Sequence, residues 1–394
     1  MSVTKLCQDF MLKSLTIHKK RVLALADICQ ALMNGAYLSV TSLGRYVNSN
    51  AQMKNNIKKV DRLLSNEQLY QEQVQIYQEI FAPLLACLST LYIIVDWSGC
   101  CRSDEYVLSA SLQYDGRSIT IYNENHPQHL LGNEQVHIAF LENLSKILPS
   151  NKPVIMVTDA GFLTPWFKAV TARGWDYVGR INNLLKIRLD NADEWIRVNT
   201  CEESARQTPT YVGTGQRGKS VSLSLQTSFY TYKQPPAHRH GRSKFPAINK
   251  RYSNSNSRAW LIMTSLPPET FKAKQIINIY KKRMQIEQNF RDDKSERFGF
   301  GWRFGRTLQI HRLAILLLIA SISTFFLWWM GLSLEDRGLH LKYQANTTKN
   351  KRVLSFVFLA KEFLRHLKYP ISMSMLHDAA KRFENKYEEF ILCQ

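Results

Sequence analysis

The feature that most constrains the fold of this chain is an uncharged segment of 22 residues, Leu313–Leu334, flanked by an arginine and a glutamate. A helix of this length and composition either crosses a membrane or lies in the interior of a protein. Ser321, Ser323 and Thr324 lie within the segment, and the rest of the chain is polar and has no second stretch of this kind. We therefore expect a buried core helix and keep a membrane span as the alternative.

The charge balance indicates a polyanionic partner. The 394 residues include 52 Lys and Arg against 32 Asp and Glu, for a net charge of +20. With 45% hydrophobic residues, the chain can bury a core, and acidic, collagen-like and secreted disulfide-rich classes are excluded. The seven cysteines are scattered without a zinc-binding spacing, and the N-terminus shows no apolar signal region. We expect an intracellular protein with free thiols and a nucleic-acid or anionic membrane partner.

Residues 1–80 are expected to form a helical, basic domain that binds DNA. Apolar residues recur with helical spacing over 23–33, and a short turn leads to a second, basic helix over 52–64. The second helix carries four cations, namely Lys54, Lys58, Lys59 and Arg62. A helix–turn–helix unit can place one helix in the major groove while its cations neutralise phosphates. The alternative is a basic face that is merely solvated.

Residues 90–310 show the strand and helix order of a mixed sheet. Strands are expected at 91–95, 106–114, 118–122, 154–158, 177–181 and 260–265, and helices at 134–148 and 164–173. Asp115-Gly116 lies between the second and third strands and is a strong hairpin signal. Two hairpin strands, a helix and then a parallel strand match the order of a ribonuclease-H-like fold.

A stretch of 65 residues, 204–268, contains ten Lys or Arg and no Asp or Glu. Without local carboxylates, such a surface should attract phosphate strongly. Residues 221–232 alternate as a β-ribbon would, and a β-rich basic segment is expected over about 182–258. Its cations Arg239, Arg242 and Lys244 are candidate DNA contacts. A disordered basic loop is the alternative.

Two aspartates follow short apolar strands in the same way. Asp96 comes after the strand at 91–95, and Asp159 comes after the strand at 154–158. Ligands of open α/β sheets gather at the carboxyl ends of the strands, so neighbouring strands would bring both carboxylates to one edge. There they could hold divalent cations. Either aspartate taken alone is more typical of a turn.

A long helix expected over 269–296 carries four polar residues on one stripe. Tyr280, Arg283, Glu287 and Lys294 fall within about 60° of one face at about 100° per residue. The stripe could supply a third metal-binding carboxylate with cations beside it. A solvated face with intrahelical ion pairs is the alternative.

These segments resemble the three acidic regions of DDE transposases from bacterial insertion sequences. The resemblance is carried by Asp96-Trp97-Ser98, by 158–162 (Thr-Asp-Ala-Gly-Phe) and by the spacing Tyr280-x2-Arg283-x3-Glu287-x6-Lys294. More narrowly, the chain is similar to the insertion-sequence-four family, with its Tyr-Arg-Glu-Lys signature, and most similar to the transposon-ten group. The resemblance extends nearly end to end, through Asn56–Leu64 and Gln344–Thr347.

The resemblance implies an α/β fold with a ribonuclease-H-like mixed sheet, a β-rich insertion, a helical N-terminal DNA-binding unit and a helical C-terminal region over 311–394. It implies that Asp96, Asp159 and Glu287 are catalytic and bind two Mg²⁺ ions, with Mn²⁺ as an alternative. A pair of such ions stabilises the attacking and leaving oxygens of an in-line phosphoryl displacement.

Further DNA contacts follow from the same resemblance. Tyr280, Arg283 and Lys294 would contact phosphates near the cleaved end, and Arg180 would contact the transposon end. Trp260 would stack on a flipped-out base, the alternative for it being a strand-core residue. The family often has Trp directly after the signature arginine, whereas this chain has Met284.

The resulting prediction is a cut-and-paste transposase that cleaves DNA, forms a hairpin and transfers strands. Its partners would be double-stranded DNA, as inverted-repeat ends and as target, and a second copy bound to DNA. We expect no membrane and no small-molecule substrate, and a cytoplasmic, nucleoid-associated protein of bacteria. The alternative is a DNA-binding regulator with an inactive nuclease-like core.

Overall fold

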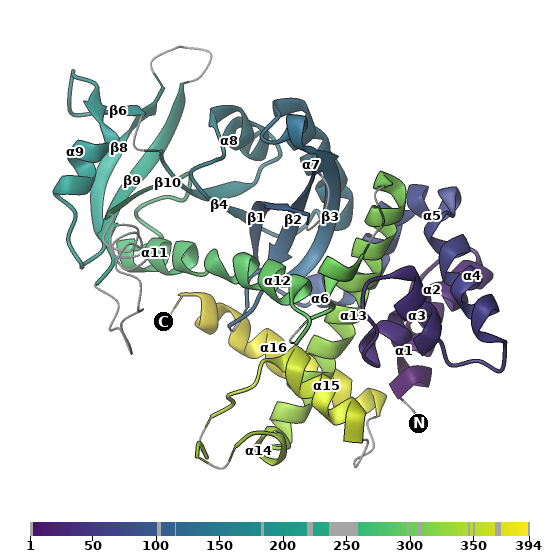
Figure 1. Ribbon diagram of the computed structural model, residues 1–394. Coiled ribbons are helices and arrows are strands. Elements are labelled where there is room, and N and C mark those ends of the chain that lie inside the picture. The colour runs from purple at the N-terminus through teal and green to yellow at the C-terminus, as the bar shows by residue number, and fades with distance from the viewer. Residues whose placement is uncertain are drawn as a thin grey trace, which may run out of the picture. The chain divides into compact units, whose positions relative to one another are not determined.

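The computed structural model describes residues 3–392 except 101–103, 115, 183–184, 219–223, 236–258, 298, 306, 308, 346, 350 and 367–371. The chain forms two compact units (Figure 1). Unit 1 comprises Met1–Lys152 and Met284–Phe390, and unit 2 comprises Pro153–Arg283 and Ile391–Gln394. Both units combine strands with helices, which confirms the mixed α/β class. The domain ranges expected from the sequence, 1–80, 90–310 and 311–394, stay predictions.

Unit 1 contains three antiparallel strands in the order β3-β2-β1. These are β1 (Leu91–Gly99), β2 (Glu105–Leu112) and β3 (Ile119–Pro127). The expected hairpin is confirmed by the pairing of β2 with β3, and Gly116 in its turn has φ 71°. β1 is longer than predicted, because pairing with β2 continues through Asp96↔Ser109 to Gly99↔Tyr106. Asp96 therefore lies within the strand, and only the apolar pattern stops at Val95.

The uncharged segment forms most of α13 (Ile310–Asp336), the one helix among the described residues that is long and apolar enough to cross a membrane. Its side chains from Leu313 to Leu334 are almost all buried. The helix packs against α2, α15 and β3, and Figure 1 shows it in green beside the purple N-terminal helices. The hydroxyls of Ser321 and Ser323 donate to the Leu317 and Cys29 carbonyls. This burial is that of a core helix, as expected.

The N-terminal part of unit 1 consists of six helices. They are α1 (Val3–Ser14), α2 (Lys19–Met33), α3 (Val40–Tyr46), α4 (Met53–Leu64), α5 (Glu67–Gln71) and α6 (Gln73–Ala86). The predicted helices at 23–33 and 52–64 are confirmed as parts of α2 and as α4. A Cβ on Gly44 would lie 2.6 Å from the Cα of Ile57, so α3 and α4 pack backbone to backbone.

The remaining elements of unit 1 are mainly helical. They are η1 (Gln128–Leu130), α7 (Glu134–Ile147), α12 (Met284–Lys294), η3 (Trp302–Phe304), α14 (His340–Tyr343), α15 (Phe356–His366) and α16 (Met373–Leu392). The helix predicted at 134–148 is confirmed as α7. α12 packs against β1.

Unit 2 contains a mixed sheet in the order β4-β5-β10-β9-β8-β6-β7. The strands are β4 (Val154–Thr158), β5 (Asp176–Arg180), β6 (Lys186–Leu189), β7 (Ile196–Arg197), β8 (Thr210–Arg217), β9 (Leu225–Lys233) and β10 (Ala259–Thr264). Its helices are α8 (Thr164–Thr171), α9 (Val198–Glu203) and α11 (Ala273–Lys281). β4 and β5 are parallel, and the other pairings described are antiparallel. The predicted strands at 154–158, 177–181 and 260–265 are confirmed.

The acid-free stretch contributes the antiparallel ribbon of β8 and β9. Its cations Arg239, Arg242 and Lys244 lie outside the described residues. Arg217 is 1% exposed, and burial lowers its pKa to about 10. At least one of the ten cations therefore points into the protein, where it cannot attract phosphate.

The prediction of one helix over 269–296 is wrong, because two helices occupy this range. α11 begins at Ala273, since the amides of Thr270 and Phe271 donate to the Pro267 carbonyl in a turn. It ends at Lys281, and the Arg283 amide donates to the Tyr280 carbonyl 2.9 Å away, which tightens the chain before α12 begins at Met284. The prediction that Tyr280, Arg283, Glu287 and Lys294 share one face of a single helix therefore does not hold.

Candidate active site

Asp96 and Glu287 line one pocket of unit 1, with a volume of about 710 Å³. Asp96 comes from β1, and Glu287 lies in the first turn of α12. A carboxylate is favourable there because the helix N-terminus carries partial positive charge. Phe290 lines the pocket too. Two carboxylates 191 positions apart in the sequence thus reach the same space.

Lys294 lies at the same pocket as these two carboxylates. Its ammonium donates to the Ser98 hydroxyl, with Nζ and Oγ 2.9 Å apart. Since Ser98 is two residues after Asp96, this bond joins the end of α12 to the end of β1. The pocket therefore offers three acids, Asp96, Glu287 and Glu296, and three cations, Arg291, Lys294 and Arg297.

Trp97 is held by a buried histidine. Its indole Nε1 donates to His137 Nε2 across 3.0 Å, and burial lowers the pKa of His137 to about 4. His137 is therefore neutral near pH 7 and accepts this bond. The Trp97 ring also lies 5.7 Å from the His126 ring, and His126 pairs with Glu124 across 3.0 Å. Two histidines therefore contact the residue that follows Asp96.

Asp159 belongs to unit 2 and follows β4 directly, as predicted. Its Oδ1 accepts from the amide of Gly161 across 2.8 Å. A Cβ at Gly161 would lie 3.1 Å from that oxygen, so the glycine leaves the carboxylate room. The carboxylate is therefore held at the end of a buried parallel strand.

A second group of predicted residues gathers around Tyr280 on α11 in unit 2. Burial raises the pKa of the Tyr280 hydroxyl, the charges of Arg283 and Arg180 lower it, and that of Asp159 raises it. These three charged groups are therefore close enough to Tyr280 to act on its hydroxyl. Arg180 also pairs with Glu202 across 3.5 Å.

Trp260 has aromatic partners on both sides within unit 2. Its ring lies 5.0 Å from that of Tyr280 and 5.6 Å from that of Tyr232. Trp260 is half-buried, so part of its surface is left open. Met284, the first residue of α12 in unit 1, is 46% exposed.

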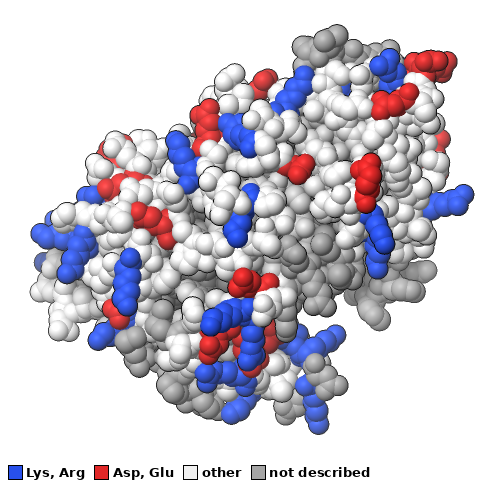
Figure 2. Space-filling view, turned by 180° about the vertical axis from the view of Figure 1, so that it is seen from behind, with Lys and Arg blue, Asp and Glu red and all other residues white. Residues whose placement is uncertain are grey.

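The four cations of α4 differ in their surroundings. Lys54, Lys58 and Arg62 are exposed, whereas Lys59 is half-buried and forms an ion pair with Asp27. Over the face shown in Figure 2, lysine and arginine side chains are scattered, with acidic side chains among them. The surplus positive charge on this face is therefore spread out.

The residues present suit a divalent cation in part. Carboxylate oxygens are the hard donors that Mg²⁺ takes in proteins, and the pocket of unit 1 offers three such groups, on Asp96, Glu287 and Glu296. Across the part of the chain that the structure describes, no group of three His, Cys, Asp or Glu side chains could hold a metal ion. The third predicted ligand, Asp159, lies in unit 2.

Sequence reasoning missed several pocket residues and the support behind Asp96. Arg291, Ser295, Glu296 and Arg297 line the pocket and were not predicted as site residues. Arg291 follows Glu287 by four positions, so helical spacing could have indicated it. His137 gave no signal, because it occurs among the apolar residues of α7.

The family model described as "Transposase DDE domain" matches residues 96–323 of this chain. The match begins at Asp96, includes Asp159, Glu287 and Lys294, and ends within α13. No curated protein matches the chain.

Proposed function

The chain belongs to the family of transposases with a DDE domain, and from this premise we propose that it is a cut-and-paste transposase of the insertion-sequence-four type, transposon-ten-like group. The pocket shared by Asp96, Glu287 and Lys294 is the observation that supports this proposal most directly. Displacement at a phosphodiester needs acidic side chains that hold divalent cations. It also needs a positively charged side chain that holds the phosphate whatever the DNA sequence is. The pocket has both.

Asp96, Glu287 and Asp159 would hold two Mg²⁺ ions, with Asp159 supplied by unit 2. When bound, these ions would activate the attacking oxygen and stabilise the leaving oxygen. The protein's own part is to fix the carboxylates. Trp97 and His137 fix β1 next to Asp96, and the Gly161 amide fixes Asp159.

The reaction would proceed by successive attacks of oxygen on phosphorus. Water attacks one strand at the end of the element and releases a 3′ hydroxyl. This hydroxyl attacks the opposite strand to give a hairpin, a second water reopens the hairpin, and the 3′ hydroxyl then joins target DNA.

The charged groups around these acids would position the DNA. Lys294 and Arg283 are suited to phosphate oxygens, because each carries a full positive charge. Tyr280 and Arg180 would contact the DNA beside Asp159. The half-buried ring of Trp260 would stack on a flipped base, and exposed Met284 would touch the strand from which that base came.

The N-terminal helices would bind the inverted-repeat ends. Lys54, Lys58 and Arg62 of α4 are exposed and free to face phosphates, whereas Lys59 would first have to leave Asp27. Two ends must be held together for excision, so we propose a homodimer on DNA. The protein would act in the bacterial cytoplasm, at the nucleoid.

The acids are tested by three substitutions, Asp96→Asn, Asp159→Asn and Glu287→Gln. The substrate is a supercoiled plasmid that carries the two ends of the element, with Mg²⁺ present. Each variant should cleave at least about 100-fold more slowly, because a carboxylate that holds a cation has become a neutral amide. Binding to end DNA in a gel-shift assay should stay within about twofold.

Asp104→Asn and Glu142→Gln are the matched controls, because both alter exposed carboxylates of unit 1. They should cleave like the wild type. Cleavage at the wild-type rate by any of the three acid variants would refute the triad. A wild-type protein that binds ends but never nicks the plasmid, with Mg²⁺ or Mn²⁺, would favour the regulator alternative.

A further inference from the structure

A second pocket adjoins the acid pocket of unit 1. Its volume is about 310 Å³, and Glu296 and Arg297 line both pockets. The rest of its wall comes from the end of α2 and the segment after it, from Gly299 and from α15. A strand that leaves the acid pocket past Glu296 and Arg297 would therefore enter the second pocket.

The second pocket offers two exposed arginines. Its charged lining residues are Glu296, Arg297, Lys361 and Arg365. Lys361 is occupied, since its Nζ donates to the Gly299 carbonyl and the charge of Asp293 acts on it. Arg365 pairs with Glu362 across 2.5 Å but is exposed, as is Arg297. The two guanidinium groups can therefore meet a ligand, and each can bond a phosphate through two N–H groups.

An aromatic pair lies at the second pocket. Tyr37 lines the pocket, and its ring centroid is 4.8 Å from that of Phe304. The two side chains are 38% and 40% exposed, and the structure describes no other contact between two exposed Phe, Tyr or Trp rings. Large aromatic side chains are mostly buried, so a pair that is open to solvent indicates a binding surface.

The loop that carries Phe304 holds the aromatic pair in place. The Leu38 amide donates to the Phe300 carbonyl across 2.9 Å. Gly301 has φ 57°, and a Cβ there would lie 2.5 Å from Tyr37 Cδ1, so the Tyr37 ring rests on the backbone of the loop. The rings are thus ordered before a ligand arrives, which lowers the entropy lost on binding.

The aromatic pair also connects the second pocket to the N-terminal helices. Phe304 lines a further pocket of about 590 Å³, whose wall includes residues 39–41 at the start of α3 and Gln309 before α13. The acid pocket, the second pocket, the aromatic pair and α3 therefore follow one another through shared or touching residues. This series leads from the proposed catalytic acids to the helices proposed to bind DNA.

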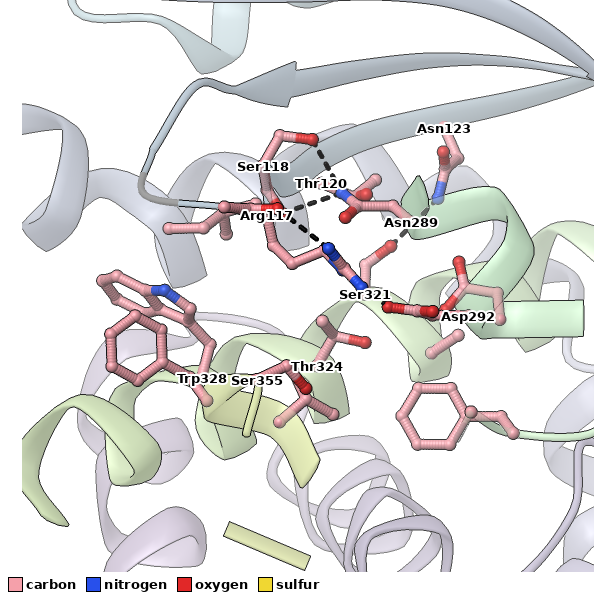
Figure 3. Close-up of a pocket in the computed structure, with 18 of the residues that line it drawn as sticks. Arg117, Ser118, Thr120, Asn123, Asn289, Asp292, Ser321, Thr324, Trp328 and Ser355 are labelled. Atoms are coloured by element: carbon pink, nitrogen blue, oxygen red, sulfur yellow. Dashed lines mark hydrogen bonds and ion pairs between the residues drawn. The ribbon is translucent and has the colours of Figure 1, made fainter. Parts of the chain in front are cut away.

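The cavity of about 260 Å³ drawn in Figure 3 shares Gly299 with the second pocket but is not suited to a phosphate. Its charged lining residues are Arg117, Asp292, Asp293 and Arg352. Arg117 pairs with Asp292 and Arg352 pairs with Glu335, each across 2.8 Å, and the charge of Asp293 acts on Lys361. Each charged group of that lining thus has an opposite charge beside it.

We propose that the second pocket binds an unpaired stretch of DNA, with phosphates on Arg297 and Arg365 and a base on the rings of Tyr37 and Phe304. Sites for single-stranded nucleic acid combine cations along the backbone with aromatic rings on which bases stack. Bases within a duplex are stacked on one another, whereas an unpaired base has a free face. The proposal rests on the proposed function only in taking DNA as the ligand.

The test measures binding of a single-stranded oligonucleotide of about 12 nucleotides, a length within the range of single-strand sites. It carries fluorescein and is titrated with the full-length protein in EDTA, so that no strand is cut. Tyr37→Leu and Phe304→Leu should each weaken binding about tenfold, because leucine is apolar but has no face for stacking. Tyr37→Trp should keep the wild-type affinity within about twofold.

Tyr211→Leu is the matched control. Tyr211 is 42% exposed and has a ring neighbour, Tyr230, 5.2 Å away, but it lines neither the acid pocket nor the second pocket. This variant should bind the oligonucleotide like the wild type. A blunt duplex of the same length should bind Tyr37→Leu and the wild type within about twofold of each other, because its bases stay stacked.

Arg365→Gln tests the phosphate contact. The slope of log affinity against log salt concentration should decrease by about 0.7, the value for one phosphate of a single strand. Lys146→Gln removes an exposed cation of α7 and should leave the slope unchanged.

A photo-crosslink locates the bound strand. An oligonucleotide that contains iodouracil should form an adduct on Tyr37 or Phe304, identified by mass spectrometry. Wild-type affinity in both leucine variants, an equal loss for the duplex, or adducts confined to other residues would overturn the proposal. If one leucine variant does not fold, the other decides. Failure of the proposed function is seen separately, as a plasmid that the wild type never nicks with Mg²⁺.

Discussion

Three consecutive residues at the end of β1 have three different tasks. Asp96 presents its carboxylate to the pocket, Trp97 is bonded to His137, and Ser98 accepts from Lys294. Trp97 also lines the pocket, and its bond to His137 links β1 to α7 between the two polar residues.

Lys294→Met tests whether this cation binds DNA. Cleavage should fall by at least about tenfold, and the slope of log affinity against log salt concentration should decrease by about 0.9, the value for one lost phosphate contact. Gel-shift titrations at several salt concentrations measure the slope.

Ser98→Ala is the control for a merely structural role of Lys294. It removes the bond between α12 and β1 but keeps the positive charge. The salt slope should stay that of the wild type. The same decrease in both variants would show that Lys294 acts by tethering the helix.

At the scale of elements, α13 is the structural centre of unit 1. α2, α15 and β3 all pack against it, and the Phe10 ring of α1 lies 5.5 Å from both Phe326 and Trp329. A Cβ at Gly331 would lie 2.2 Å from the Phe356 carbonyl oxygen. The glycine thus lets the backbones of α13 and α15 approach closely.

Gly331→Ala should destabilise the protein although alanine favours helices. The new methyl group would force α15 away, at a cost of about 1–3 kcal/mol in the free energy of unfolding. Over most of this range the cost exceeds the gain in helix propensity, which is about 1 kcal/mol. We expect the melting temperature of the protein to fall by about 2–6 °C. Ser145→Ala, at an exposed position of α7, is the control and should not lower the melting temperature. A rise in Gly331→Ala would show that the helices can separate freely.

Elements with a local signal could be predicted from the sequence. The hairpin of β2 and β3, the strand β4 and the helices α4 and α7 all follow from periodicity and turn residues. The break between α11 and α12 could not be predicted, because Lys282 and Arg283 favour helices as well as most residues do. The end of β1 was missed because its pairing with β2 outlasts its apolar pattern.

The acidic residues of the candidate site could be predicted from the sequence, whereas the contacts that support them could not. Asp96 and Glu287 were found by strand context and motif spacing, and the structure brings them to one pocket. Trp97–His137 is a tertiary contact between a strand and a helix 40 positions apart, and a single sequence carries no local sign of it.

At the scale of the whole molecule, unit 1 is built from two separated stretches of chain. Ion pairs join the two stretches, since Arg117 pairs with Asp292 across 2.8 Å and Arg312 pairs with Asp61 across 2.7 Å. Within the second stretch, the charges of Asp293 on α12 and Lys361 on α15 act on each other, and Lys361 Nζ donates to the Gly299 carbonyl 2.5 Å away.

The stability of the protein should depend on pH through Asp293. Burial, with the nearby charge of Asp292, raises its pKa to about 7 from 3.8, against the opposing charges of Lys361 and Lys294. Between these values the folded chain keeps a proton that the unfolded chain has lost. The free energy of unfolding should therefore fall as the pH rises from about 4 to 7, by up to about 1.4 kcal/mol per pH unit.

The measurement is urea unfolding at pH 5, 6 and 7 for the wild type and Asp293→Asn. As the pH rises, the unfolding free energy of the wild type should fall relative to that of Asp293→Asn. His137, whose pKa is lowered to about 4, makes both proteins more stable as the pH rises to about 6.5, and this contribution cancels in the difference. A difference that is constant with pH would contradict the prediction.

The contact between α2 and α13 joins a residue that is synthesised early to one that is synthesised late. The Cys29 carbonyl accepts from Ser323, which the ribosome adds 294 residues later. At about 5–20 residues per second, the apolar side of α2 waits roughly 15–60 s for its partner. A nascent chain in this state exposes a surface that invites aggregation or chaperone binding, and a message truncated before α13 leaves it uncovered for good.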